Sequence, residues 1–276
     1  MPPPPPNGKN GGIQAVKKSF AVKGGANVAA QKVIIYGPGG VGKTELASLI
    51  AKSGIKPVFL DITDGTKFLN VDRVEPSPEC WDDLRDALRT ESLFDGCGAI
   101  VIDDLTKAEE FATAWALKNI RNDKGELVQS VEKYGFGKGL THVYESFLPI
   151  LSDLDAHARK GRWIICIAHE CVENVPNPSG EDWLQYQPRL QSPKSGKASI
   201  RHRVKEWTDH LICVTFDQAV NEEGKAIGSG TRTIYTCELP TWWAKSRSLS
   251  QSFAYERGSN ELWQRLLKGE NHAESD

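Results

Sequence analysis

The stretch Val33 to Ile50, VIIYGPGGVGKTELASLI, runs from an apolar segment through a glycine-rich turn into a helical pattern. It contains G-x-x-x-x-G-K-[ST], and a strand before this motif with a helix after it is the context in which the motif binds phosphate. Backbone N–H groups of the turn and the positive end of the helix attract phosphate oxygens. We therefore predict a nucleotide-binding loop made of Gly37, Pro38, Gly39, Gly40, Val41, Gly42, Lys43, Thr44 and Glu45.

Two residues of this loop predict a metal-assisted reaction of ATP. In loops of this kind the lysine, here Lys43, reaches the β- and γ-phosphates, and the hydroxyl of the next residue, Thr44, ligates Mg²⁺. The apolar run AIVIDD (99–104) contains the carboxylate expected to be the second Mg²⁺ ligand, Asp103. The next acid, Asp104, either polarises the attacking water or caps the following helix. The expected cofactors are therefore ATP and Mg²⁺.

Short apolar runs alternate with helical stretches along the chain, which is typical of βαβ units. We predict an α/β fold with a mostly parallel central sheet flanked by helices. The last two apolar runs, DHLICVTF (209–216) and TRTIYTCEL (231–239), are expected to be strands that can pair antiparallel.

Composition divides the chain into a tail, a core and a C-terminal segment. Residues 1–30 are rich in proline and glycine and are expected to be disordered. Residues 31–250 carry the predicted strands and helices of the core, and residues 251–276 are expected to form a helix and a polar tail. Within the core, residues 172–206 are rich in Pro, Ser and Gly, so we expect a long, mobile loop there.

Charge and cysteine content limit the class of protein. The formal net charge is −2, so nucleic-acid binding would require a local basic patch. The six cysteines form no C-x-x-C pair, which favours reduced thiols over a zinc site or disulfides. No apolar run reaches the roughly 18 residues of a membrane helix. We expect a cytoplasmic protein that makes no membrane contact.

Residues outside the loop narrow the class of ATPase. Partition-type ATPases carry a signature lysine where this chain has Pro38, and nucleotide kinases need a lid and an arginine-rich acceptor site that the sequence does not reveal. This favours ATPases with an extra strand between the phosphate-loop strand and the Asp103 strand, and KPVFLD (56–61) fits that strand. Asp61 and Asp64 then lie where such ATPases place a catalytic carboxylate, although acids in TDGT can equally stabilise a turn.

Polar residues at two further positions are candidates for the site. His169, at the end of the strand-like ICIAHE, is either a sensor of the γ-phosphate or a structural histidine. Lys245 and Arg247 alternate in WWAKSRS, so on an extended segment both point to one side. They would either act on the phosphates of a neighbouring subunit, like an arginine finger, or form a solvated basic turn.

A basic segment covers positions 189–205 and contains no acid. Aromatic residues, Trp183 and Tyr186, lie just before it. Such a segment can follow a single-stranded backbone while aromatic rings stack on bases, although surface lysines also serve solubility alone. The predicted nucleic-acid contacts are Arg189, Lys194, Lys197, Arg201, Arg203 and Lys205.

The order of these motifs resembles the phage nucleotide-binding ATPases of RecA type, some of which are single-strand annealing recombinases. The resemblance is carried by VIIYGPGGVGKT, VFLDITDGT, AIVIDDLT, YGFGKGLTHVYESF, ICIAHE, KEWTDHLI and WWAKSRS. It implies a RecA-like fold, ATP and Mg²⁺ binding, single-stranded DNA as a partner, and a homo-oligomer such as a ring or filament. It also implies a sensor role for His169 and intersubunit roles for Lys245 and Arg247. Because Thr63 stands where the family usually has a glutamate, hydrolysis would use Asp64 or Asp104, or be slow.

Three functions follow as hypotheses. The first is an ATPase that acts on single-stranded DNA in phage recombination or strand annealing. The second is a nucleotide-dependent switch, similar to a helicase loader, that acts on a protein partner without touching DNA. The third is a small-molecule kinase, which would consume ATP only in the presence of an acceptor.

Overall fold

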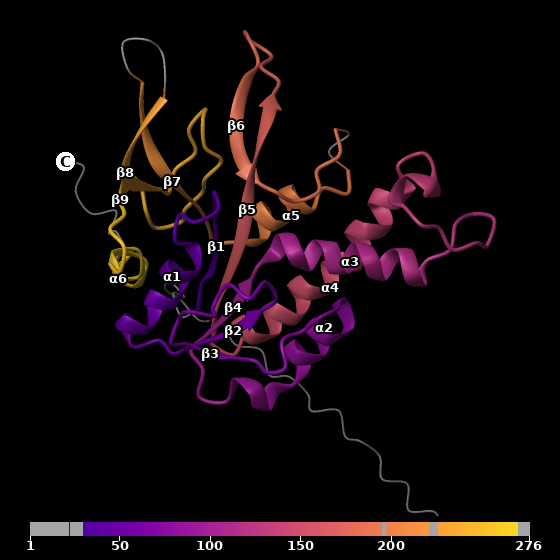
Figure 1. Cartoon of the computed structure of the whole chain (residues 1–276), viewed down its shortest axis with the longest axis horizontal. Coiled ribbons are helices and arrows are strands. Elements are labelled where there is room, and N and C mark those ends of the chain that lie inside the picture. Colours follow the sequence, from indigo (N-terminus) through magenta and orange to yellow (C-terminus); the bar gives the residue numbers. More distant parts are fainter. Residues whose placement is uncertain (1–21, 23–29, 195–196, 221–225, 270–276) are drawn as a thin grey trace, which may run out of the picture.

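The computed structural model describes residues 22, 30–194, 197–220 and 226–269. Most of the tail predicted for residues 1–30, and the polar end from residue 270, therefore lie outside the described residues. The described residues form a twisted sheet with helices packed on both faces (Figure 1).

The sheet runs in the order β3-β2-β4-β5-β1-β7-β8-β9, and β6 pairs with β5 off this path. Neighbours from β3 to β7 are parallel, whereas the pairs β5–β6, β7–β8 and β8–β9 are antiparallel. This confirms the predicted α/β class with a mostly parallel central sheet and late antiparallel strands. The strands are β1 (Lys32–Gly37), β2 (Pro57–Asp61), β3 (Asp72–Arg73), β4 (Ala99–Asp103), β5 (Trp163–Val175), β6 (Trp183–Pro188), β7 (His210–Val220), β8 (Ala226–Tyr235) and β9 (Phe253–Ala254).

Strand β5 lies between the phosphate-loop strand β1 and strand β4. Its first half, WIICIA, is apolar throughout and buried, as expected of a central parallel strand covered on both faces. The expectation that residues 56–61 form the strand between β1 and β4 is wrong, because β2 pairs with the opposite edge of β4. That pairing places Asp61 opposite Asp103.

Two hydrophobic cores, one on each face of the sheet, hold the helices. On one face α2, α3, α4 and α5 pack against alternate residues of the strands, such as Ile34 and Cys166. On the other face α1 and α6 pack against the intervening residues, such as Ile35 and Ile165. The helices are α1 (Lys43–Ser48), α2 (Trp81–Arg89), α3 (Leu105–Asn119), α4 (Lys138–Ala158), α5 (Ile200–Trp207) and α6 (Glu261–Lys268), with short 3-10 turns η1 (Leu49–Ser53), η2 (Glu91–Phe94) and η3 (Val131–Tyr134).

Helix α6 covers the phosphate-loop helix α1. The Trp263 side chain is fully buried, and its indole Nε1 donates a 2.7 Å hydrogen bond to the Leu46 carbonyl oxygen. Leu262 and Leu266 join the same core. The C-terminal helix is thus part of the packing that holds the phosphate loop in place.

The long loop expected over residues 172–206 is largely replaced by regular structure. The end of β5 and β6 form a projecting antiparallel hairpin (Figure 1), and α5 begins soon afterwards. Ser199 caps α5 by accepting a hydrogen bond from the His202 N–H, and Ile200 and Val204 are buried on one face of the helix. The loop was predicted because this segment is rich in Pro, Ser and Gly, and the short alternation of apolar and polar residues that is typical of strands was missed. Among the helices of the described ranges, none combines the length and hydropathy that a bilayer-spanning segment needs.

Candidate active site

The phosphate loop joins β1 to α1 at the carboxyl end of the parallel strands, where open α/β sheets bind ligands. Gly37 lies so close to β7 that a Cβ atom there would come within 1.9 Å of the Val214 carbonyl oxygen, and Gly42 has a left-handed φ of 101°. Only glycine suits both positions. The Lys43 Nζ donates hydrogen bonds to the carbonyl oxygens of Gly37 (2.9 Å) and Pro38 (2.8 Å). The loop therefore curls around the ammonium group.

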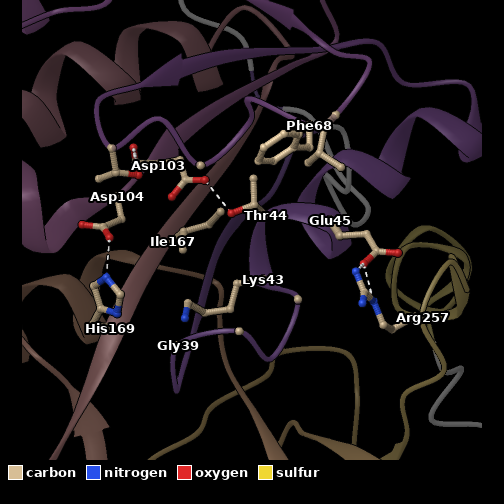
Figure 2. Close-up of a pocket in the computed structure, with 15 residues that line it drawn as sticks. Gly39, Lys43, Thr44, Glu45, Phe68, Asp103, Asp104, Ile167, His169 and Arg257 are labelled. Atoms are coloured by element: carbon tan, nitrogen blue, oxygen red, sulfur yellow. Dashed lines mark hydrogen bonds and ion pairs between the residues drawn. The ribbon is translucent and has the colours of Figure 1, made fainter.

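Thr44 and Asp103 meet at the base of the loop. The Thr44 hydroxyl donates a 2.7 Å hydrogen bond to Asp103 Oδ2 (Figure 2). Burial raises the pKa of Asp103 to about 6, against the stabilising effect of this hydrogen bond on the carboxylate. A hydroxyl and a carboxylate are oxygen donors of the kind that Mg²⁺ prefers, so this pair fits the expected cation.

Asp61 organises the neighbouring loop and is not free to act on a ligand. Its buried carboxylate accepts hydrogen bonds from the N–H groups of Thr63 (3.2 Å), Gly65 (3.0 Å) and Thr66 (2.8 Å), and from the Thr66 hydroxyl. Asp64 is exposed, with φ 58°, and does not line the cavity described below. The structure therefore favours the turn-stabilising role for Asp61 and leaves Asp64 outside the cavity lining, between the lining residues Thr63 and Gly65.

Asp104 links helix α3 to His169. Its Oδ1 accepts a 2.7 Å hydrogen bond from the Lys107 N–H, so the predicted capping role is confirmed. Its Oδ2 lies 3.1 Å from His169 Nε2. The His169 N–H in turn donates to the Thr106 hydroxyl at 3.2 Å. The first turn of α3 thus fixes both the backbone and the ring of His169.

These groups surround one cavity of about 450 Å³. Figure 2 shows Lys43 and Thr44 entering it from α1, Asp103 and Asp104 from the end of β4, and His169 from β5. A second cavity of about 310 Å³ shares His169 and Asp104 and continues toward Arg189. Burial lowers the pKa of Lys43, and the nearby carboxylates of Asp103 and Asp104 oppose that effect.

Phe68 and Arg257 are among the residues lining the first cavity that were not predicted from the sequence. Phe68 lines it although its side chain is 94% exposed, and Arg257 forms a 2.6 Å ion pair with Glu45 in the first turn of α1. Phe68 follows TDGT in a polar stretch, where an isolated aromatic residue was a usable signal. Arg257 lies far along the chain and belongs to no motif.

The basic segment is only partly available for a partner. Arg201 is buried, and its guanidinium donates hydrogen bonds to the Leu190 carbonyl (3.1 Å) and Gln187 Oε1 (2.9 Å) and pairs with Glu173 (2.8 Å). Its prediction as a nucleic-acid contact is wrong, because its role is to join α5 to the hairpin.

The other basic residues differ in exposure. Arg189 lines the second cavity, and Lys205 pairs with Glu238 (2.8 Å) above the Trp243 ring. The exposed cations of the segment are Arg189, Lys194, Lys197 and Arg203.

The cations of WWAKSRS have partners within the chain. Lys245 Nζ donates to the carbonyl oxygens of Lys205 (3.0 Å) and Thr208 (2.7 Å), where it caps the end of α5. Arg247 pairs with Asp209 at 3.2 Å and keeps most of its side chain exposed. Both cations lie beside the end of α5, at Thr208 and Asp209, and Arg247 is the more exposed of the two.

The chain is similar to one protein family and to several solved structures. No curated protein sequence matches the chain. Among solved structures, a KaiC-like protein from the hyperthermophilic archaeon Pyrococcus horikoshii is similar at 13% identity and a TM-score of 0.44, over 83% of this chain and 87% of that one. The flagellar accessory protein FlaH from Methanocaldococcus jannaschii is similar at 12% identity and a TM-score of 0.32, over 74% and 76% of the two chains. The model of the AAA domain family matches residues 29–248. This chain therefore belongs to the AAA domain family.

Proposed function

We propose that the protein is a cytoplasmic, Mg²⁺-dependent ATPase that uses ATP to act on single-stranded DNA in phage recombination or strand annealing, as a ring or filament of identical subunits. The observation that carries the ATPase part is the convergence of Lys43, the Thr44–Asp103 pair and the Asp104–His169 pair on one cavity. The DNA and phage parts are supported by the motif order and by the exposed cations Lys194, Lys197 and Arg203.

Each group around the cavity has a role in this proposal. Lys43 balances the charge of the β- and γ-phosphates, and Thr44 and Asp103 hold Mg²⁺, which supplies further neutralisation of that charge. His169 contacts the γ-phosphate. Phe68, as an exposed ring on the wall, stacks on the base.

ATP binding is tested by replacing Lys43 with alanine. The affinity for a fluorescent ATP analogue should fall at least ~10-fold, because the phosphates lose their buried cation. Lys118→Ala, at an exposed position on α3, is the matched control and should bind as the wild type does. Unchanged binding by Lys43→Ala would refute the proposed nucleotide site.

DNA binding is tested with three of the exposed cations of the basic segment, Lys194, Lys197 and Arg203. Replacing all three with glutamine should weaken binding to labelled single-stranded DNA and reduce its dependence on salt, because fewer counterions are released. The control removes three positive charges elsewhere, at Lys118, Lys124 and Arg159.

A nucleotide-dependent switch acting on a protein partner is the second candidate. Two features favour it because they suit slow hydrolysis. Thr63 stands where the resembling family has a glutamate, and the Asp61 carboxylate already accepts hydrogen bonds from its own loop. The exposed apolar residues Val172 and Leu184 on the β5–β6 hairpin also suit a protein surface. ATP binding without salt-sensitive DNA binding would select this candidate.

A further inference from the structure

ATP hydrolysis needs a group that accepts a proton from the attacking water, and the acids that line the cavity are already engaged. Asp61 accepts four hydrogen bonds from its own loop, and Asp64 lies outside the cavity lining. Asp103 is bonded to Thr44 at the expected Mg²⁺ position. Asp104 accepts the Lys107 N–H with one oxygen and faces His169 with the other. Glu45, the remaining acid of the described lining, is paired with Arg257 at 2.6 Å. Of the described lining side chains, His169 then keeps a basic lone pair, on the ring nitrogen that does not face Asp104.

The ring of His169 is oriented for this task. With Nε2 3.1 Å from Asp104 Oδ2, the ring proton belongs on Nε2, and Nδ1 carries the lone pair. Figure 2 shows the second ring nitrogen on the side of Lys43, the side on which the phosphates would enter. The Thr106 hydroxyl holds the His169 backbone at 3.2 Å. A buried carboxylate that fixes the tautomer and orientation of a histidine is the arrangement by which enzymes make imidazole a general base.

We propose that His169 is the general base of ATP hydrolysis and that Asp104 is its positioning residue. The inference rests on the proposed ATPase function and assigns a residue to its chemical step. A water oxygen forms a bond to the γ-phosphorus while one of its protons passes to His169 Nδ1. The bond from the γ-phosphorus to the bridging oxygen breaks, and its electron pair leaves with ADP. Asp104 stabilises the imidazolium, which then releases the proton to solvent.

The charges around His169 keep its ring neutral at neutral pH, as a base requires. Burial lowers the pKa of His169, the cations Lys43 and Arg189 lower it further, and Asp104 and the more distant Glu110 oppose them. The ring is therefore able to accept a proton at pH 7.

The first test separates a base from a sensor. His169→Gln keeps a side chain that can hydrogen-bond to a γ-phosphate but cannot take up a proton. Its kcat should fall ~100-fold or more, with affinity for the fluorescent ATP analogue within about 3-fold of the wild type. In the wild type, kcat should fall as the pH is lowered and His169 becomes protonated. In the variant, kcat should not show this fall. His142→Gln, on α4 beside Tyr134, is the matched control and should hydrolyse ATP like the wild type.

The second test addresses the positioning residue. Asp104→Asn keeps a good helix cap, so α3 should remain folded. The Asn amide donates an N–H to His169 Nε2, so it favours the tautomer in which Nδ1 carries the proton. In that tautomer Nδ1 has no lone pair and cannot accept a proton from water. We expect kcat to fall about as much as in His169→Gln. Because Asp104 and His169 act as one pair, the double variant should lose little more than either single variant.

The outcomes distinguish the inference from the function on which it rests. Wild-type-like turnover by His169→Gln, with the same pH profile, would overturn the base assignment and leave the ATPase function standing. Wild-type protein that binds ATP and never hydrolyses it would overturn both the ATPase function and the base. Additive losses in the double variant would overturn the role of Asp104.

Discussion

Asp61 and Asp103 are register partners at the ends of adjacent parallel strands, yet their carboxylates serve different purposes. The Asp61 carboxylate accepts hydrogen bonds from N–H groups of the loop that follows β2. Asp103 instead accepts a hydrogen bond from the Thr44 hydroxyl. The first acid therefore shapes the wall of the cavity, and the second faces the ligand. The loop shaped by Asp61 brings Gly65 against Asp103 and Phe68 to the cavity, so changes in this loop should alter nucleotide binding.

Gly65→Ala should damage the Mg²⁺ position. A Cβ atom there would lie 2.9 Å from Asp103 Oδ2 and 3.4 Å from Thr44 Oγ1, so the Asp103 carboxylate would have to shift from its place beside Thr44. We expect the Mg²⁺-dependent part of ATP affinity to fall ~10-fold, about 1.4 kcal/mol, with little change in melting temperature. Titration with the fluorescent analogue in Mg²⁺ and in EDTA measures this part. An equal loss in both buffers would contradict the prediction.

Phe68→Ala should weaken ATP binding, because a ring that stacks on the base would be lost. The expected rise in Kd is roughly 5- to 50-fold, and Phe68→Trp should restore most of the affinity. Phe136→Ala is a suitable control, since Phe136 is equally exposed but lies on the loop before α4. If the two alanine variants bind ATP equally well, Phe68 does not contact the base.

Arg201→Ala should destabilise the protein, in contrast to Arg203→Ala. Removing the buried guanidinium leaves the Leu190 carbonyl, Gln187 and Glu173 without their partner, which should cost about 2 kcal/mol in the free energy of unfolding. Arg203 is exposed and 3.9 Å from Glu206, so its removal should change stability by less than ~0.5 kcal/mol. Urea denaturation of the two variants measures the difference. Equal stabilities would contradict the structural role of Arg201.

His210 should make the protein sensitive to acid. Burial lowers its pKa to about 4, and its ring is held between Gln31 (2.7 Å) and Ser246 (2.8 Å). In the unfolded chain the pKa of His210 is about 6.5. Between pH 6.5 and pH 4 the unfolded state therefore binds a proton at His210, whereas the folded state does not. This contribution to stability is complete above about pH 6.5 and is lost as the pH falls to 4, on the order of 3 kcal/mol in all.

The measurement is the free energy of unfolding between pH 4 and pH 8. His210→Gln should flatten its acid side, whereas His142→Gln should leave the slope of the wild type. A slope that His210→Gln does not change would show that other groups cause the acid sensitivity.

The sequence was sufficient where function depends on neighbours along the chain. Lys43 and Thr44 are adjacent, and Asp103 ends an apolar strand, so the loop and its partner could be placed from the pattern alone. The sequence was insufficient where a role depends on which hydrogen bonds a side chain makes after folding. Arg201 and Lys245 looked like free cations because their acceptors are oxygens from other elements, which no local pattern reveals.

Sheet order was hidden for a similar reason. β2 lies between β1 and β4 along the chain, but β5 lies between them in the sheet, since each crossover helix returns the chain to a position set by packing. The hairpin of β5 and β6 was missed because its composition resembles that of a loop, while its alternation spans only a few residues.

The packing of α6 on α1 has a consequence for the limits of the catalytic unit. The family match ends at residue 248, but Trp263, Leu262 and Leu266 lie beyond it and cover the helix that carries Lys43 and Thr44. A protein ending at residue 248 would expose Leu46 and Ile50 to water and leave the Leu46 carbonyl without its indole donor. Helix α6 therefore supports α1 from behind, and we expect that a shortened protein must extend at least to Lys268 to keep the phosphate loop folded.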